Sequence, residues 1–399
     1  GEAFAVWEGG RPSGTQVSSR APGRRWRHEK GFPSFNQGEP QIAATGREAV
    51  LVWSGAPRDH PSRGGVSIFA ATRFPGTSWS KPQKLSAEKR WEYEPEGEDP
   101  QVAITPQGEA VTMWTASDEG HANNSFIKAA SRPLHGGWSP AVGIPGSIEG
   151  EEPQLAVGPS GEAVALWHAY YNEESGMEVA SRPAGEKWSA VHRVSHPGAF
   201  PQLQIATTRH GEAVAAWEVE GEGDWAERRV QVATRKPGRP WRVHTFSPRE
   251  GELIDAPQVV IEPGGRAAAV WRRTTLTEAA EEKEYVVAFH SPGGEWTEPQ
   301  HLFAVDFEGG VEFAVTGRSE WIAVWRAAGA GPRQSLIEVS SKARGQAWSA
   351  PVTLSGAPGA RISRASEPRL AVTPKGEAFA AWRAFDGNRW VIEAATRRP

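Results

Sequence analysis

A tryptophan at the end of a short apolar segment recurs eight times along the chain, and this repeat constrains the fold more than any other feature. A glutamate lies five residues before the tryptophan in seven of the eight copies, and Arg266 takes its place in the other. A regular period of this kind indicates a repeat architecture, in which each unit packs against the next. The repeated tryptophans are Trp7, Trp53, Trp114, Trp167, Trp217, Trp271, Trp325 and Trp382.

The clearest copy of the repeat divides into four short segments, which we name strands a, b, c and d. They span residues 153–157, 161–167, 177–183 and 188–190. Short apolar runs rich in Val and Ala and bounded by Gly or Pro are typical of β-strands. A second set of tryptophans opens strand d, and we interpret both sets as scaffold. The second set is Trp26, Trp79, Trp138, Trp188, Trp241, Trp296 and Trp348.

Four short strands per repeat predict an all-β fold, a β-propeller of four-stranded antiparallel blades. The chain contains eight copies of strand b, which favours eight blades, with seven as the alternative. We expect one propeller domain over residues 1–399, with a proline opening strand a where its missing N–H costs no ladder bond. The prolines are Pro40, Pro100, Pro153, Pro257 and Pro368. The repeat units are approximately 1–38, 39–98, 99–151, 152–200, 201–255, 256–310, 311–367 and 368–399.

Composition excludes several classes of protein. The formal net charge of -4 and the pI near 6.3 argue against a nucleic-acid-binding role, which usually needs a basic footprint. The chain has no cysteine, which excludes disulfides and thiolate metal sites. No apolar run is long enough to cross a bilayer, so we expect no membrane insertion. We expect an extracellular or cell-surface protein whose export signal is not in this chain.

The hairpin between strands c and d resembles the Asp box of sialidase-like propellers, also called the BNR repeat. It reads Ser181-x-Pro183-x-Gly185-x-x-Trp188, with the spacing of Ser-x-Asp-x-Gly-x-x-Trp. In this chain the Asp is missing from every copy. The resemblance implies the propeller fold, with the d–a and b–c connections on one face and the c–d hairpins on the other. Residues at the Asp position are Ala21, Phe74, Pro133, Pro183, Lys236, Ser291 and Ala343.

Sialidase catalysis would need three arginines, a tyrosine nucleophile with a partner glutamate, and a general acid. Only four tyrosines are present, and spacing pairs none of them with an arginine triad. They are Tyr93, Tyr170, Tyr171 and Tyr285.

Sorting the charges by connection predicts two faces of opposite sign. The d–a loops carry many Glu and Asp, whereas the c–d hairpins repeat a cation after the Ser or Thr. We therefore expect an acidic loop face and a basic hairpin face. The hairpin cations are Arg20, Arg73, Arg132, Arg182, Arg235, Lys342 and Arg397.

A carboxylate directly precedes strand a in four repeats, at Glu39, Asp99, Glu152 and Glu367. Crowded carboxylates need a cation, a raised pKa or intervening water, and calcium suits oxygen ligands. Calcium is thus a possible cofactor at the mouth of the central channel. Solvated carboxylates without a metal are the alternative.

Three consecutive b–c loops also carry histidine, at His60, His121 and His168. Together with neighbouring carboxylates they are candidates for a metal site. Ordinary polar loop positions are the alternative for these residues.

Aromatic residues in predicted loops are candidates for ligand contact, because they offer apolar area and polar tips. Tyr170 and Tyr171, with His168 beside them, form the best candidate for stacking on a sugar or contacting a peptide. Trp91 and Trp225 lie outside the repeated tryptophan positions and fall in loops on the same face. Covering the bases of loops is the alternative role for these two.

The sequence therefore favours a non-catalytic recognition module that binds glycan or an extracellular protein through one loop face. A sialidase-like glycoside hydrolase, or another glycan-cleaving enzyme, is the first alternative. A structural repeat domain of a larger extracellular assembly is the second.

Overall fold

The computed structural model describes most of the chain. The described residues are 2–9, 14–33, 40–55, 66–86, 97–117, 125–171, 174–195, 198–220, 228–277, 280–305, 310–329, 331, 334–356, 364–373 and 375–398. The regular elements among them are all β-strands. None of the described segments forms a helix suited in length and apolarity to crossing a membrane.

Within the described residues the strands form eight antiparallel sheets, seven four-stranded and the last three-stranded. The protein is thus an eight-bladed β-propeller, and the prediction of eight blades rather than seven is confirmed. Strand d of the first repeat is split into β3 and β4, which both pair with β2. The first three sheets contain β1 (Ala3–Gly9), β2 (Gly14–Arg20), β3 (Arg27–His28) and β4 (Phe32–Pro33); β5 (Gln41–Ala44), β6 (Ala49–Gly55), β7 (Ser67–Arg73) and β8 (Gln83–Lys84); and β9 (Glu98–Ile104), β10 (Ala110–Ser117), β11 (Ser125–Arg132) and β12 (Val142–Ile148).

The first sheet begins with strand b, the second to seventh contain strands a, b, c and d in chain order, and the last contains strands a, b and c. The fourth and fifth contain β13 (Gly150–Val157), β14 (Ala163–Tyr171), β15 (Glu174–Arg182) and β16 (His192–Arg193); and β17 (Ala199–Thr207), β18 (Ala213–Val219), β19 (Arg229–Arg235) and β20 (Arg242–Phe246). The last three contain β21 (Glu252–Ile261), β22 (Ala267–Leu276), β23 (Glu281–His290) and β24 (Gln300–Val305); β25 (Val311–Val315), β26 (Trp321–Ala328), β27 (Ser335–Lys342) and β28 (Val352–Thr353); and β29 (Arg364–Val372), β30 (Ala378–Phe385) and β31 (Trp390–Arg397).

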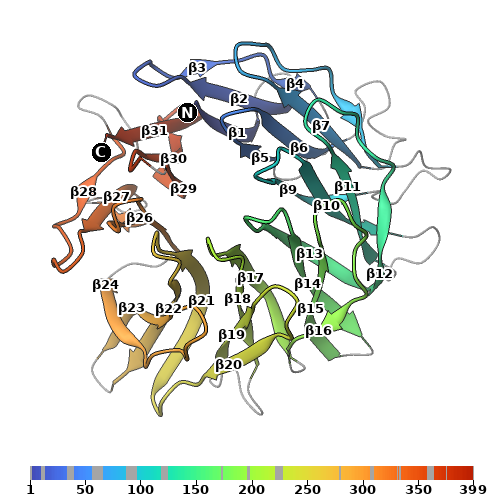
Figure 1. Cartoon of the computed structure of the whole chain (residues 1–399). Coiled ribbons are helices and arrows are strands. Elements are labelled where there is room, and N and C mark those ends of the chain that lie inside the picture. The colour runs from blue at the N-terminus through green and yellow to red at the C-terminus, as the bar shows by residue number, and fades with distance from the viewer. Residues whose placement is uncertain are drawn as a thin grey trace. The chain divides into compact units, whose positions relative to one another are not determined.

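The chain divides into two compact units, which are described separately below. Unit 1 comprises Gly1–Gly221 and Gln231–His244, and unit 2 comprises Glu222–Val230 and Thr245–Pro399. Within unit 1 the inner strands β5, β9, β13 and β17 lie side by side in chain order (Figure 1). Within unit 2 the inner strands β21, β25 and β29 are also neighbours.

The strand-b tryptophans fill the space between neighbouring sheets, as the repeat predicts. Trp167 is fully buried and packs in one cluster with Ile127 and Ile144 of the preceding sheet. The fit is tight, because a Cβ added to Gly150 would lie 2.8 Å from the Trp167 ring. Six of the eight strand-b tryptophans are among the largest fully buried side chains, so this set is scaffold rather than ligand platform.

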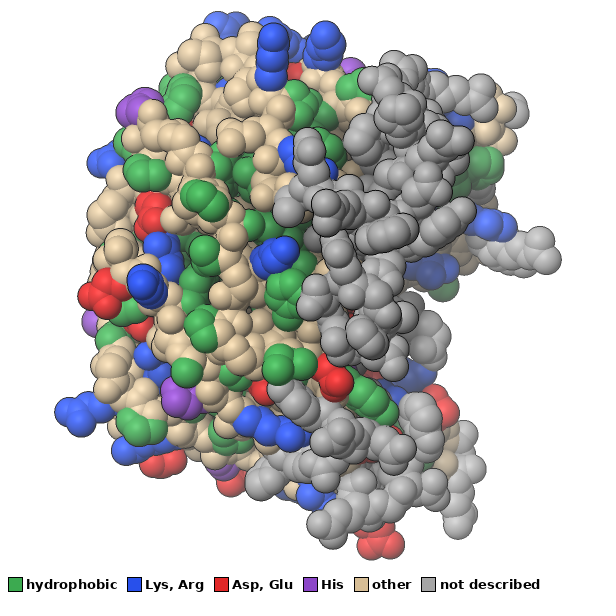
Figure 2. Space-filling model, turned by 90° about the vertical axis from the view of Figure 1, so that its right-hand side faces the viewer, with side chains coloured by type: hydrophobic (Ala, Val, Ile, Leu, Met, Phe, Trp, Pro, Cys, Tyr) green, Lys and Arg blue, Asp and Glu red, His purple; other side chains and the backbone are tan. Residues whose placement is uncertain are grey.

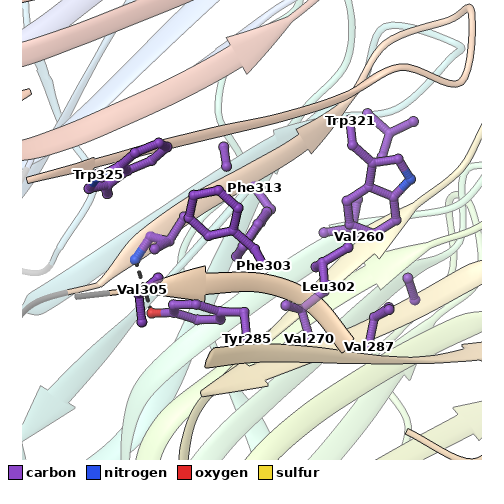
Figure 3. Close-up of a cluster of buried hydrophobic side chains, with 14 residues drawn as sticks. Val260, Val270, Tyr285, Val287, Leu302, Phe303, Val305, Phe313, Trp321 and Trp325 are labelled. Carbon is purple, nitrogen blue, oxygen red and sulfur yellow. Dashed lines mark hydrogen bonds between the residues drawn. The ribbon is translucent and has the colours of Figure 1, made fainter. Parts of the chain in front are cut away.

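In unit 2 the same packing builds a cluster of buried aromatic side chains between two sheets (Figure 3). Tyr285 on β23 and Phe313 on β25 meet edge to face, with ring centroids 5.2 Å apart. The Tyr285 hydroxyl oxygen accepts a hydrogen bond of 3.2 Å from the backbone N–H of Val311. The polar end of this buried ring is therefore satisfied within the core.

Four of the strand-a prolines lie within the strand at a β-bulge, so the expectation that they open the strand is wrong. Pro100, Pro153, Pro257 and Pro368 each follow a residue with a left-handed backbone, with φ between 49° and 53°. The pairing with strand b shifts register at the same point in β9, β13, β21 and β29. A bulge tolerates proline because it already interrupts the ladder. Only Pro40 directly precedes its strand, β5.

The hairpin cations are largely buried in ion pairs between neighbouring sheets, so the expected basic face is wrong at these positions. Arg132 pairs with Glu48, and both side chains are almost wholly buried. Arg182 lies 2.9 Å from Glu109, and the carboxylate in each pair is the glutamate that precedes the strand-b tryptophan by five residues. Further pairs of this kind are Arg73–Glu2 and Arg235–Glu162, and Arg397 makes the same contact with Glu320 although its side chain is 53% exposed. The repeated glutamate before strand b and the repeated cation of the c–d hairpin, which the sequence shows as separate patterns, therefore form ion pairs with each other.

Candidate functional site

Two carboxylates of unit 1 lie at β-bulges, close enough to interact electrostatically. Asp99 and Glu152 occupy the same bulge position in neighbouring sheets, and their φ angles are 50° and 49°. Partial burial of the Glu152 carboxyl group, the charge of Asp99 and the charge of Glu151 together raise the pKa of Glu152 above its usual value. The structure therefore brings together two of the four carboxylates predicted to crowd one another.

His168 extends this group of charged residues toward the next sheet. It lies on β14 directly opposite Glu151, and its Nε2 is 3.1 Å from the carbonyl oxygen of Ala199 on β17. Burial lowers the pKa of His168, although this hydrogen bond and Glu151 partly oppose the shift. Glu151 in turn accepts a hydrogen bond of 3.2 Å from Ser125. A largely neutral imidazole at neutral pH follows from this environment.

Tyr170 ends the same face of β14, two residues beyond His168, and its side chain is 54% exposed. Its backbone is fixed on both sides, since it pairs with Ser175 and its N–H bonds to the carbonyl oxygen of Glu149 at 3.1 Å. The ring is thus an exposed apolar surface on a rigid support. The side chain of Tyr171 lies outside the described residues. We call Asp99, Glu151, Glu152, His168 and Tyr170 the bulge strip.

Unit 2 also has carboxylates at two bulges, Glu367 at the position of Glu152 and Asp255 at that of Glu151, and arginines pair with both. Arg272 makes two hydrogen bonds to Asp255, of 2.7 and 2.6 Å. Arg383 lies 2.9 Å from Glu367, another of the predicted carboxylates. Both arginines directly follow a strand-b tryptophan, the position that His168 occupies in unit 1. In these two sheets, the residue after the strand-b tryptophan pairs with a carboxylate at the bulge of the same sheet.

Trp390 is a candidate ligand contact that the sequence analysis missed. It begins β31 at the b–c hairpin and is 45% exposed, with the Arg383 guanidinium 4.8 Å from the centre of its ring. Its place outside both tryptophan sets, next to the turn sequence Asp386-Gly387-Asn388, was the signal that could have identified it. Trp321, the other extra tryptophan among the described residues, is buried in the core of unit 2.

Tyr285 is a core residue, which leaves it without the exposure that a nucleophile needs. It is fully buried, and burial raises the pKa of its hydroxyl. Nearby, burial raises the pKa of Glu312 although Arg369 lies 2.9 Å from it. Glu312 is thus a third carboxylate of unit 2 that pairs with an arginine, in addition to Asp255 and Glu367.

Several predicted site residues lie outside the described part of the chain, namely Trp91, Trp225, Glu39, His60 and His121. The described residues contain no group of three or more His, Asp or Glu side chains that could hold a metal ion.

Figure 2 shows the side of the molecule on which β12 lies in Figure 1. No dominant apolar patch is visible on this side. Hydrophobic side chains lie scattered there among basic and other polar ones, apart from the area covered by grey atoms (Figure 2). Among the large hydrophobic residues that the structure describes as exposed, two are aromatic, Tyr170 and Trp390. Both lie at b–c hairpins.

The fold and the bulge strip define a β-propeller with acidic and aromatic residues gathered at one end of its blades. No protein family and no curated protein matches the sequence. Among solved structures, the polysaccharide lyase Uly1 is similar with a TM-score of 0.54 and 8% identity over 86% of each chain. At this identity the likeness supports the propeller fold alone.

Two further solved structures have lower TM-scores. The Trypanosoma rangeli sialidase in complex with sialic acid has a TM-score of 0.47 and 9% identity over 100% of this chain and 59% of its own. The α-L-arabinofuranosidase Arb93A from Fusarium graminearum has a TM-score of 0.46 and 10% identity, over 91% and 93%.

Proposed function

We propose that this protein is a glycan-recognition propeller, which binds carbohydrate at the end of the blades that carries the bulges and the b–c hairpins. The observation that carries the proposal is the exposed ring of Tyr170, fixed on a hairpin beside the charged and polar residues of the bulge strip. A sugar presents an apolar C–H face and a rim of hydroxyls, and both find partners there.

Three features support this reading. Tyr170 supplies a stacking surface, Glu151 and Glu152 are hydroxyl acceptors, and a neutral His168 offers a ring nitrogen. Trp390 with Arg383 and Glu367 offers the same combination of ring and charged groups in unit 2. The similarity of the fold to a polysaccharide lyase is compatible with a glycan ligand. We infer an extracellular or surface location from the same ligand class.

The c–d hairpins fit this scheme as Asp-box-like turns with a structural role. In one of them the backbone N–H of Glu186 bonds to the carbonyl oxygen of Pro183 at 3.0 Å, and Trp188 is buried. The turn thus forms without the acidic residue that the Asp box has at the position of Pro183.

A glycan array, followed by titration calorimetry on the ligands found, tests the proposal. We expect Tyr170→Ala to weaken binding at least tenfold, a loss of about 1.4 kcal/mol or more, while the melting temperature stays unchanged because the ring is exposed. Tyr170→Phe is the matched control, since it keeps the stacking surface. Binding that survives Tyr170→Ala undiminished, or an array without any ligand, would sink the proposal.

A second candidate function is glycan cleavage, which one observation favours. Asp99 and Glu152 form a pair in which one carboxyl group has a raised pKa. Pairs of this kind divide the work of catalysis, with the protonated member acting as general acid and the ionised one as base or nucleophile. Glu152 would donate the proton, and Asp99 would be the second carboxyl group of the pair.

Release of new sugar ends from a panel of polysaccharides tests this second function. Glu152→Gln should abolish turnover while leaving ligand affinity within about threefold, a difference below roughly 0.7 kcal/mol. Turnover that persists in Glu152→Gln argues against the assigned acid. Binding without turnover in the unaltered protein leaves the recognition module as the function.

A further inference from the structure

Unit 1 contains a cavity of about 520 Å³ at the opposite ends of its inner strands from the bulge strip. Its wall is built by the a–b turns of four successive sheets, which follow β5, β9, β13 and β17. The strands start at the bulges and finish at these turns, so the cavity and the bulge strip lie at opposite ends of the same strands. The volume lies in the range of pockets that take small molecules.

The described residues that line the cavity include two cations and no anion. Arg47 and Arg209 are exposed arginines in the first and last of the four turns. Arg47 reaches a neutral acceptor, the carbonyl oxygen of Gln107, at 3.5 Å, and the Nε of Arg209 is 3.2 Å from the His210 ring. Neither contact compensates the positive charge.

The glutamates of the same turns do not line the cavity, and Glu212, in the turn that carries Arg209, is buried. Glu48 pairs with Arg132 and Glu162 lies 2.6 Å from Arg235, both between neighbouring sheets. The turns therefore keep their cations at the cavity while their anions face the interior of the blades.

The rest of the wall is rigid and mostly apolar. The Thr45 hydroxyl accepts the backbone N–H of Arg47 at 3.1 Å, and the Thr208 hydroxyl accepts that of His210 at 3.2 Å. These bonds fix the two turns that carry the arginines. Ile104, Val157 and two prolines supply the apolar side chains of the lining, which also includes Thr105, Thr207 and three glycines.

We propose that this cavity binds a small organic anion, a molecule with an apolar body and one phosphate, sulfate or carboxylate group. The arginines supply charge-assisted hydrogen bonds to the anionic group. The apolar part of the wall contacts the body of the ligand. The cavity should therefore bind an organic anion more tightly than an inorganic ion. The site is distinct from the bulge strip, so its ligand is independent of the proposed glycan.

Titration calorimetry with three probes on the full chain tests the proposal. Phenyl phosphate combines the anion with an apolar ring, inorganic phosphate has the anion alone, and phenol has the ring alone. We expect phenyl phosphate to bind at least about tenfold more tightly than either of the others. Phenyl sulfate and benzoate then distinguish the sources of the anionic group.

Arg47→Gln and Arg209→Gln should each weaken phenyl phosphate binding about tenfold, as expected for one charge-assisted bond. Arg318→Gln is the matched control. It lies in the equivalent turn after β25, with its N–H likewise bonded to a threonine hydroxyl at 3.3 Å, and it does not line the cavity. The control variant should bind as the unaltered protein does.

A measurement on the unaltered protein guards against variants that fail to fold. Raising the sodium chloride concentration should weaken phenyl phosphate binding through screening of the arginines and leave phenol binding unchanged. Absence of phenyl phosphate binding at millimolar concentration, an affinity insensitive to salt, or equal affinity in the double variant of Arg47 and Arg209 would each overturn the proposal.

Discussion

Glu48 and Arg132 form an ion pair in the interior of unit 1 although 84 positions separate them in the chain. The exposed fractions of their side chains are 0% and 4%. Arg132 also lies over the Trp138 ring, with the guanidinium 5.7 Å from its centre. A glutamate of one sheet, an arginine of the next and the tryptophan that opens strand d thus form a single contact.

Breaking this pair should destabilise the protein strongly, because the remaining partner would be a buried, uncompensated charge. We expect Glu48→Ala to lower the free energy of unfolding by about 3–5 kcal/mol. Replacing both residues, as in Glu48→Leu with Arg132→Met, should cost much less than the sum of the single changes. Denaturant titrations measure both. Arg389→Ala, in an exposed pair with Asp386, is the control and should change stability by less than about 1 kcal/mol. A cycle in which the single effects simply add would contradict the pairing.

The raised pKa of Glu152 predicts a stability effect with a definite sign. The folded state favours the protonated carboxyl, so the ionised form costs stability once the pH rises through the raised pKa. Glu152→Gln should therefore raise the melting temperature at neutral pH, and the gain should disappear below the ordinary glutamate pKa of about 4.3. Asp99→Asn should reduce the gain, because it removes one cause of the shift. An equal gain at every pH would argue against ionisation as the cause.

Tyr285→Phe should cost about 1–3 kcal/mol of unfolding free energy, because it leaves the buried N–H of Val311 without its acceptor. Tyr170→Phe, at an exposed position, is the control and should be neutral. Burial raises the pKa of Tyr285, which means that the folded state favours the neutral, protonated hydroxyl. The unaltered protein should consequently lose stability above the ordinary tyrosine pKa of about 10, and the Phe variant should lack that part of the loss.

Ala256→Gly should stabilise the protein. Ala256 occupies the bulge of β21 with φ at 53°, a backbone that costs a residue with a Cβ about 1–2 kcal/mol. Glycine removes that strain and adds a smaller entropy cost in the unfolded chain, so we expect a net gain of about 0.5–1 kcal/mol. Ala267→Gly, in the regular part of the neighbouring strand β22, should destabilise by a similar amount. Chemical denaturation of the two variants side by side decides the matter.

The sequence predicts the number of blades because the same local packing requirement recurs in each repeat. Side chains of strand b must fill the space between its sheet and the neighbouring sheet. The strand-b tryptophan, for example Trp167, does so in most repeats. The bulges escaped prediction, since Pro153 has the same sequence context whether it opens a strand or interrupts one. The hairpin arginines were misread because burial of a charge depends on a partner one sheet away.

The candidate site was predictable only in part, for a related reason. Tyr170, His168, Asp99 and Glu152 were identified by residue type, and local pairing brings them into one strip. Trp390 escaped because its exposure depends on the geometry of one hairpin. Trp91 and Trp225, the two loop tryptophans chosen from sequence, lie outside the described residues, so their role stays a prediction.

The ion pairs between sheets also set the rules for exchanging parts of this chain. Each pair joins a glutamate at the start of strand b to an arginine at the finish of strand c in the following repeat. A graft that replaces a single sheet would need to supply the correct glutamate or arginine on each flank, while exposed residues of the b–c hairpins could be varied. Chimeras that keep both ion pairs should remain soluble while their surface residues change. Chimeras that lose one partner should bury an unpaired charge at the boundary between the sheets.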